Sequence, residues 1–345
     1  MDLEKIIAIS DRGKADYFHG RTKEINFVKD ILKLSKEKKK GHSILIQGAP
    51  GVGKTALLRE LEKIGSETGW TISRIELEAL WNVNELYNCL IDEKTSQEVN
   101  VNVKLAAGTM HFDRTERTVS KTIRAINKPR ILVLDEAQMI SVGHQTDSPE
   151  IKKAAQLFNQ LHNIELEHGL VFLIAGLSDT RSIFKQFKIS RFNSDCVINL
   201  SVLEKEAERS ILKDYLVQGA GVDTNNPNLN GWIDPMSEET YQWAHHISSY
   251  GQVASEKVKN NHGLLSDELL FEGLKDSRDK KNIYYNGRFV ELEAPERASI
   301  FNAIFENEEK ENVIVGFKVK SDFKTNPIIE NSEKMFQEVI ARGIL

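Results

Sequence analysis

The chain has few of the features that mark secreted or membrane proteins. Its two cysteines, Cys89 and Cys196, are far apart and have no C-x-x-C spacing, which argues against a disulfide framework and against a zinc site. No apolar run approaches the roughly 18 residues that a membrane helix needs. The segment from Met1 to Lys5 lacks the charged-then-apolar layout of a signal peptide. We therefore expect a cytoplasmic protein with no membrane partner.

A strong charge bias is also missing. The chain has 46 basic and 51 acidic residues and a net charge of −5, so any contact with nucleic acid requires a local patch. Hydrophobic residues make up 40%, which is close to the globular average and predicts a buried core. The basic run 36–40 ends a predicted helix. We expect a solvated helix end there, with phosphate contact as the alternative.

Short apolar strands alternate with helices over residues 1–203. The pattern predicts strands at 43–47, 71–77, 131–134, 170–175 and 196–200, and helices at 22–40, 53–67 and 149–167. This alternation implies right-handed crossovers and a parallel sheet covered by helices. Residues 99–105 alternate apolar and polar side chains instead, which indicates either a sheet edge or a protruding hairpin.

Beyond residue 203 the predicted elements are mostly helices. Helices are expected at 204–218, 237–247, 252–261 and 266–280, with a long loop over 219–235. From residue 284 the composition changes again, and a helix, a short strand and a last helix at 332–342 are expected. We therefore divide the chain into an α/β core (1–203), an all-α domain (204–280) and a small C-terminal domain (281–345).

A phosphate-binding motif lies between a predicted strand and a predicted helix. The segment from Gly48 to Thr55 matches G-x-x-x-x-G-K-[ST] at every position. Its glycines allow backbone N–H groups to turn around phosphate oxygens, and the helix N-terminus adds positive potential. Lys54 would reach the β- and γ-phosphates of ATP, and the Thr55 hydroxyl would ligate Mg²⁺. The residues expected to bind the nucleotide here are Gly48, Ala49, Pro50, Gly51, Val52, Gly53, Lys54, Thr55 and Ala56.

Two acids end the apolar strand 131–134. Buried parallel strands deliver such side chains to the carboxyl edge of the sheet, where ligands bind. We expect Asp135 to hold Mg²⁺, directly or through water, and Glu136 to polarise the attacking water. Both carboxylates would then lie beside the phosphate loop.

A hydroxyl group follows the strand 170–175. Ser178 is the candidate that would hydrogen-bond the γ-phosphate or the attacking water. Asp179 and Thr180 are alternatives, and helix capping is the structural explanation for all three. Further on, Arg191 is either a salt-bridge residue or an arginine finger offered to a neighbouring subunit. Arg181 is the second choice for that finger.

Taken together, these motifs resemble AAA+ ATPases of the group that contains origin-recognition initiators and the ATPase regulators of bacterial transposons. The resemblance rests on 19–21, 48–55, 134–138, 178 and 190–192. It implies a parallel-sheet P-loop core, an all-α lid and a winged-helix-like C-terminal domain. It also implies that Tyr17 to Arg21 lie against the adenine and that the subunits assemble into a homo-oligomer.

Two departures from that family bear on function. The lid segment 250–257 has no arginine at the place of the second sensor, so turnover is expected to be slow or dependent on a partner. From residue 281 onward acidic residues outnumber basic ones, whereas a DNA-reading module is locally basic. The C-terminal domain would contact DNA, or else pack against a protein partner or against the chain itself.

We expect an ATPase that acts on duplex DNA or a DNA-bound protein complex. The alternative is a nucleotide-gated signalling or defence switch that activates an unidentified protein partner. A kinase that phosphorylates a small molecule fits poorly, because Glu136 and Arg191 suit water activation and assembly.

Overall fold

A computed structural model describes residues 17–74, 129–141, 170–186 and 196–290. The chain forms two compact units. The sheet unit comprises Arg21–Gly48 and Lys54–Leu200, and the helical unit comprises Met1–Gly20, Ala49–Gly53 and Ser201–Leu345. The elements predicted at 99–105 and 149–167 and the winged-helix-like domain after residue 290 lie outside the described residues. The division of the chain at residues 203 and 280 stays a prediction.

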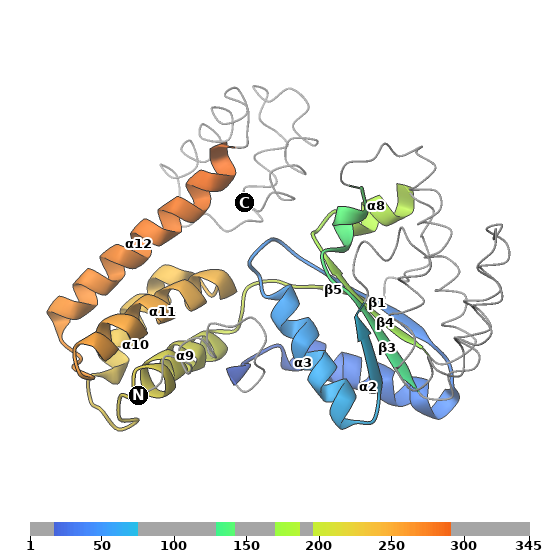
Figure 1. Ribbon diagram of the computed structural model, residues 1–345, viewed down its shortest axis with the longest axis horizontal. Coiled ribbons are helices and arrows are strands. Elements are labelled where there is room, and N and C mark those ends of the chain that lie inside the picture. The colour runs from blue at the N-terminus through green and yellow to red at the C-terminus, as the bar shows by residue number, and fades with distance from the viewer. Residues whose placement is uncertain (1–16, 75–128, 142–169, 187–195, 291–345) are drawn as a thin grey trace, which may run out of the picture. The chain divides into compact units, whose positions relative to one another are not determined.

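Among the described residues, five parallel strands form the sheet (Figure 1). In chain order they are β1 (His42–Gln47), β2 (Thr71–Arg74), β3 (Arg130–Leu134), β4 (Val171–Gly176) and β5 (Val197–Asn199). Their spatial order is β2-β3-β4-β1-β5. Every residue of β3 and β4 is buried, as expected for strands covered on both faces. The α/β fold class with a parallel sheet is confirmed.

The register aligns the carboxyl ends of the three central strands. Gln47 at the end of β1 pairs with Gly176 at the end of β4, and Leu134 at the end of β3 pairs with Ile174. The residues that follow β1, β3 and β4 therefore meet at one edge of the sheet. This is the edge at which parallel α/β sheets bind ligands.

Two helices cover part of this sheet. Helix α3 (Lys54–Glu67) packs against β2, β3 and β4, and α2 (Thr22–Lys38) packs against α3. Leu57, Leu58 and Leu61 of α3 are fully buried, in the i, i+1, i+4 pattern of a helix with one apolar face. Both helices were predicted from this periodicity.

The helical unit contains four α-helices in its described part. They are α9 (Lys205–Asp214), continued by a π-helical turn (Tyr215–Gly219), α10 (Leu229–Thr240), α11 (Ala244–Asn260) and α12 (Asp267–Val290). Their buried side chains form one apolar core. The expected all-α region is present, and α12 continues beyond the predicted end at residue 280.

The boundaries predicted between 219 and 261 are wrong. The expected loop 219–235 contains the first half of α10. The expected helix 237–247 is not continuous, because α10 ends at Thr240 and α11 begins at Ala244. Leu229, Trp232 and Met236 bury one face of α10, and this burial offsets the hydrogen bond that Pro235 cannot make inside the helix. The chain then reverses through Tyr241 and Gln242, which both have positive φ.

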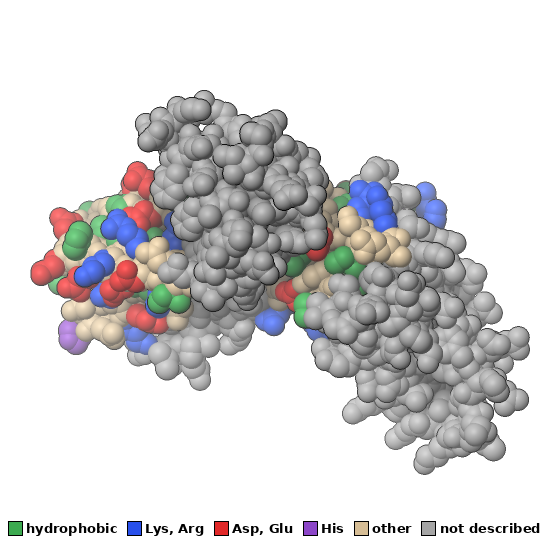
Figure 2. All heavy atoms as spheres, turned by 90° about the horizontal axis from the view of Figure 1, so that it is seen from above, with side chains coloured by type: hydrophobic (Ala, Val, Ile, Leu, Met, Phe, Trp, Pro, Cys, Tyr) green, Lys and Arg blue, Asp and Glu red, His purple; other side chains and the backbone are tan. Residues whose placement is uncertain are grey.

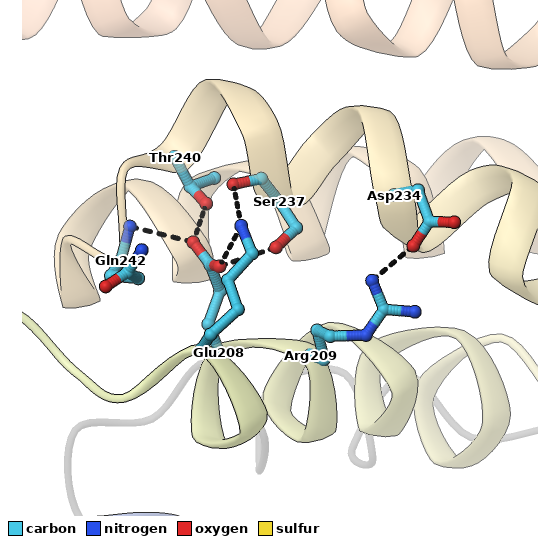
Figure 3. A network of polar contacts seen from close by, with 7 residues as sticks. Glu208, Arg209, Asp234, Ser237, Thr240 and Gln242 are labelled. Carbon is cyan, nitrogen blue, oxygen red and sulfur yellow. Dashed lines mark hydrogen bonds and ion pairs between the residues drawn. The ribbon is translucent and has the colours of Figure 1, made fainter.

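A buried carboxylate joins α9 to the reversal after α10 (Figure 3). Glu208 has no exposed surface, and it accepts hydrogen bonds from the Ser237 and Thr240 hydroxyls and from the Gln242 backbone N–H. Lys205 forms an ion pair with it at 2.9 Å. Both carboxylate oxygens are thus satisfied, which is the condition for burying a charge at tolerable cost.

Acidic and basic side chains are mixed on the surface of the helical unit. Figure 2 shows both signs side by side on the face visible at its left. Several of them pair across helices, as Lys257 does with Glu272 and Asp276 and as Arg278 does with Glu239. None of the helices in the described ranges has the length and apolar content of a membrane span.

Candidate functional site

The predicted phosphate loop follows β1 and leads into α3. Gly51 and Gly53 have φ values of 81° and 100°, a left-handed region that glycine enters without steric cost. Lys54 is the first residue of α3 and is 6% exposed. Its Nζ donates to the carbonyl oxygen of Gly48 at 3.0 Å, so the ammonium group is turned back over the start of the loop.

The two predicted Mg²⁺ ligands are brought together. Thr55 Oγ1 donates to Asp135 Oδ2 at 2.8 Å, although the residues are 80 positions apart in the sequence. A hydroxyl and a carboxylate are hard oxygen ligands, and Mg²⁺ in nucleotide sites uses one or two such groups together with phosphates and waters. The residues present therefore fit the ion. In the described ranges no group of three or more His, Cys, Asp or Glu side chains converges as a metal site of its own.

Glu136 lies next to this pair in a strained backbone conformation. Its φ is 50°, in the left-handed region that is uncommon for residues other than glycine, and such strain tends to persist at functional sites. Its side chain is exposed, while its N–H donates to Asp135 Oδ1 at 2.9 Å. Asp135 thus uses one oxygen toward Thr55 and the other toward Glu136.

Gln138 is a site residue for which the sequence reasoning assigned no role. It lies in a short 3-10 helix (Ala137–Ser141) after β3, and its Nε2 donates to Glu136 Oε2 at 2.5 Å. Its Oε1 accepts from the backbone N–H of Leu177 at 3.0 Å. A glutamine two positions after the acid predicted to polarise water was the available signal, but a single sequence does not show that the glutamine side chain turns back toward that acid.

The turn after β4 carries the three residues considered for contact with the γ-phosphate. Ser178 is half-buried in this turn, which leads into α8 (Thr180–Gln186). Burial raises the pKa of the Asp179 carboxyl. Thr180 is fully buried and its hydroxyl makes no hydrogen bond. The strand order places this turn beside the end of β3. The choice of Ser178 among the three residues stays a prediction.

The remaining predicted residues fall in different places. Arg21 is 4% exposed, has a φ of 58° and precedes α2, and its contact with adenine stays a prediction. Arg191 lies outside the described residues. Arg181, the second choice for the finger, lies in the first turn of α8.

Within the helical unit, the segment Ala49–Gly53 contacts residues that were not predicted to bind it. The N–H of His245, at the start of α11, donates to the Gly51 carbonyl oxygen at 3.0 Å. The His245 ring stacks on Tyr284 with 4.1 Å between ring centroids, and the Tyr284 hydroxyl donates to the Pro50 carbonyl oxygen at 3.5 Å. No sequence pattern indicates these contacts, because they join segments that are distant along the chain.

Part of the chain matches a known protein family. Residues 36–184 match the family described as AAA domain. This part of the chain is similar to AAA domains. The matched residues include β1, the phosphate loop, Asp135, Glu136 and Ser178, so the match contains most of the predicted site. No curated protein sequence matches the chain.

Solved structures share the fold of the chain. ORC2 of Aeropyrum pernix, solved as ADPNP-ADP complexes, has a TM-score of 0.58 at 13% identity, covering 97% of this chain and 89% of that one. Cdc6p of Pyrobaculum aerophilum has a TM-score of 0.53 at 13% identity, covering 98% and 89%. ORC1 of Aeropyrum pernix, solved with DNA, has a TM-score of 0.52 at 13% identity, covering 98% and 87%. These similarities confirm the parallel-sheet AAA+ fold.

Proposed function

We propose that the protein is a Mg²⁺-dependent ATPase that binds ATP at residues 48–56. The observation that carries this proposal is the hydrogen bond between Thr55 and Asp135. It joins the helix after the phosphate loop to the end of β3, at the oxygen atoms that a nucleotide-bound Mg²⁺ would need. The AAA domain match and the ADPNP-ADP complexes of Aeropyrum pernix ORC2 support nucleotide binding.

Different groups of this site would have different roles in binding. The backbone N–H groups at the start of α3 would donate hydrogen bonds to the phosphates. The Lys54 ammonium group would leave the Gly48 carbonyl oxygen and bind phosphate oxygens instead. Thr55 and Asp135 would hold Mg²⁺ between them. When bound, the ion neutralises charge on the phosphates. Arg21 would contact the adenine side of the nucleotide.

Glu136 would orient and polarise the attacking water. Its carboxylate is exposed at the ligand-binding edge of the sheet, which leaves it free to meet a water in line with the leaving phosphate. Ser178, on the neighbouring strand end, would bind the γ-phosphate or that water. Arg191 of an adjacent subunit would complete the site in a homo-oligomer.

We further propose that the ATP cycle acts on duplex DNA or on a DNA-bound protein complex. The support is the shared fold with Aeropyrum pernix ORC1, which was solved with DNA. A nucleotide-gated switch that activates a protein partner is the second candidate. Two observations favour it: α11 carries no arginine over residues 250–257, and acidic and basic groups are mixed on the visible face of the helical unit.

Steady-state ATP turnover over a series of protein concentrations, with and without duplex DNA, tests these proposals. We expect turnover to require Mg²⁺ and to vanish in Glu136→Gln, which should still bind ATP, while Lys54→Ala should lose ATP binding. A rate that rises more than linearly with protein and increases with DNA supports the DNA-acting oligomer. Slow turnover that ignores DNA favours the switch. Undiminished turnover in Glu136→Gln would remove the proposed role of Glu136.

A further inference from the structure

The side-chain amide of Gln138 connects the ends of two neighbouring strands. Gln138 is 7% exposed, and it bridges Glu136 after β3 and Leu177 after β4. The atom facing the Leu177 N–H has to be the carbonyl oxygen, because a backbone N–H can only donate. The NH₂ group therefore faces Glu136, so the amide has one defined orientation.

Local geometry makes room for this bridge. The positive φ of Glu136 turns the chain so that the side chain two positions later reaches back to it, and the Met139 N–H closes the turn on the Glu136 carbonyl oxygen at 2.9 Å. Gly176 leaves space at the end of β4. A Cβ there would lie 3.0 Å from Gln138 Oε1 and 2.2 Å from Thr180 Oγ1.

The bridge completes a continuous series of hydrogen bonds. Thr55 donates to one oxygen of Asp135, and the Glu136 N–H donates to the other. The Glu136 carboxylate then accepts from Gln138, which accepts from Leu177. The series begins at the helix that follows the phosphate loop and ends one residue before Ser178.

We propose that Gln138 is a positioning residue that sets the orientation of the Glu136 carboxylate and couples it to the end of β4. This rests on the proposed function, in which Glu136 polarises the attacking water. The donated bond occupies Oε2 of Glu136 and leaves Oε1 to face the water. Leu177 precedes Ser178, so a shift of Ser178 on contact with the phosphate would be transmitted to Glu136 through the Gln138 side chain. Hydrolysis is thereby linked to occupancy of the γ-phosphate position.

Three variants separate this role from simple packing. Gln138→Met keeps the length of the side chain and removes both hydrogen bonds. Gln138→Glu keeps an acceptor for the Leu177 N–H but removes the donor and puts a second carboxylate beside Glu136. Gln186→Glu makes the same chemical change at an exposed position of α8 and serves as the control. The measurements are kcat, ATP affinity and thermal stability.

We expect Gln138→Met to lower kcat by about 10–100-fold, since misplacing a reacting group by about 1 Å can cost about 100-fold, with ATP affinity nearly unchanged. In Gln138→Glu the donor to Glu136 is lost while an acceptor for the Leu177 N–H remains, so kcat should fall at least as far as in Gln138→Met, again with ATP affinity nearly unchanged. Gln186→Glu should keep the wild-type kcat and ATP affinity.

The outcomes distinguish this proposal from the proposed function. Wild-type kcat in both Gln138 variants, with Glu136→Gln inactive, would overturn the coupling and leave the ATPase assignment standing. A joint loss of kcat, ATP affinity and thermal stability in both Gln138 variants would reduce Gln138 to a structural role and also overturn it. Equal turnover by the wild type and Glu136→Gln would reject the catalytic role of Glu136, and with it the role proposed for Gln138.

Discussion

Thr55 and Asp135, 80 residues apart in the sequence, lie in direct contact, with 2.8 Å between Oγ1 and Oδ2. The contact exists because β3 and β1 flank β4 in a parallel sheet, so that the residue after β3 and the helix after β1 meet at one edge. In the proposed function, two oxygen ligands for Mg²⁺ would thereby be in place before the nucleotide binds. Such preorganisation lowers the cost of ordering the site on binding.

Removing the Thr55 hydroxyl should weaken the use of Mg²⁺. We expect Thr55→Ala to raise the Mg²⁺ concentration needed for half-maximal ATP turnover by about tenfold or more, because loss of one ligand or its partner typically costs about 10–100-fold in metal affinity or activity. Thr55→Ser keeps the hydroxyl and should behave like the wild type. The check is a Mg²⁺ titration of turnover, and an unchanged midpoint in Thr55→Ala would place the ion elsewhere.

If Arg191 acts on the nucleotide of a neighbouring subunit, two inactive variants should complement each other. Arg191→Ala retains Glu136, and Glu136→Gln retains Arg191, so a mixed oligomer contains some sites with both groups. We expect mixing to restore part of the ATP turnover that each variant lacks alone. The measurement is turnover across mixing ratios at constant total protein. Absence of any recovery would count against action in trans, and the test would then pass to Arg181.

Glu208 should contribute strongly to the stability of the helical unit. Replacing it with Gln removes the charge that accepts hydrogen bonds from Ser237, Thr240 and Gln242. Hydrogen bonds to charged groups are worth about 1.5–3 kcal/mol each, so we expect the free energy of unfolding to fall by about 2–3 kcal/mol. Glu206→Gln, on the exposed face of the same helix, should change it by less than about 0.5 kcal/mol. Urea unfolding of both variants decides this, and equal midpoints would contradict it.

Two glycines of the helical unit should respond oppositely to alanine. A Cβ at Gly251 in α11 would lie 2.2 Å from Cδ2 of the buried Tyr215, whereas nothing lies within 4 Å of one at Gly231 in α10. Gly251→Ala should therefore cost about 1–3 kcal/mol through overpacking. Gly231→Ala should gain about 0.5–1 kcal/mol, because glycine loses more entropy in a helix. Thermal unfolding of the two variants measures the difference, and a shift of the same sign in both would refute it.

Much of the sheet unit was predictable because its signals are local. A fully buried strand is an unbroken apolar run, as in 131–134, and a phosphate loop needs glycines at set positions before a lysine. Both patterns are read over a few residues. The predicted bounds lie within about one residue of the observed ones for β1, β3 and β4 and for the start of α3.

The helical unit was predicted less well because its boundaries depend on packing. Pro235 indicated a loop, yet the burial of Trp232 and Met236 keeps it inside α10. The reversal at Tyr241 and Gln242 is stabilised from another helix by Glu208. Neither fact is visible in the residues next to the turn.

The sequence alone determined the chemistry of the candidate site: which residues form the phosphate loop, and which acids end the strand that follows later in the chain. These are properties of short segments, since glycine conformations and apolar runs act locally. Only the tertiary structure decided that Thr55 meets Asp135 and that Gln138 joins Glu136 to Leu177. Those contacts depend on strand order and on a left-handed turn at Glu136, which are set by the packing of the whole sheet unit.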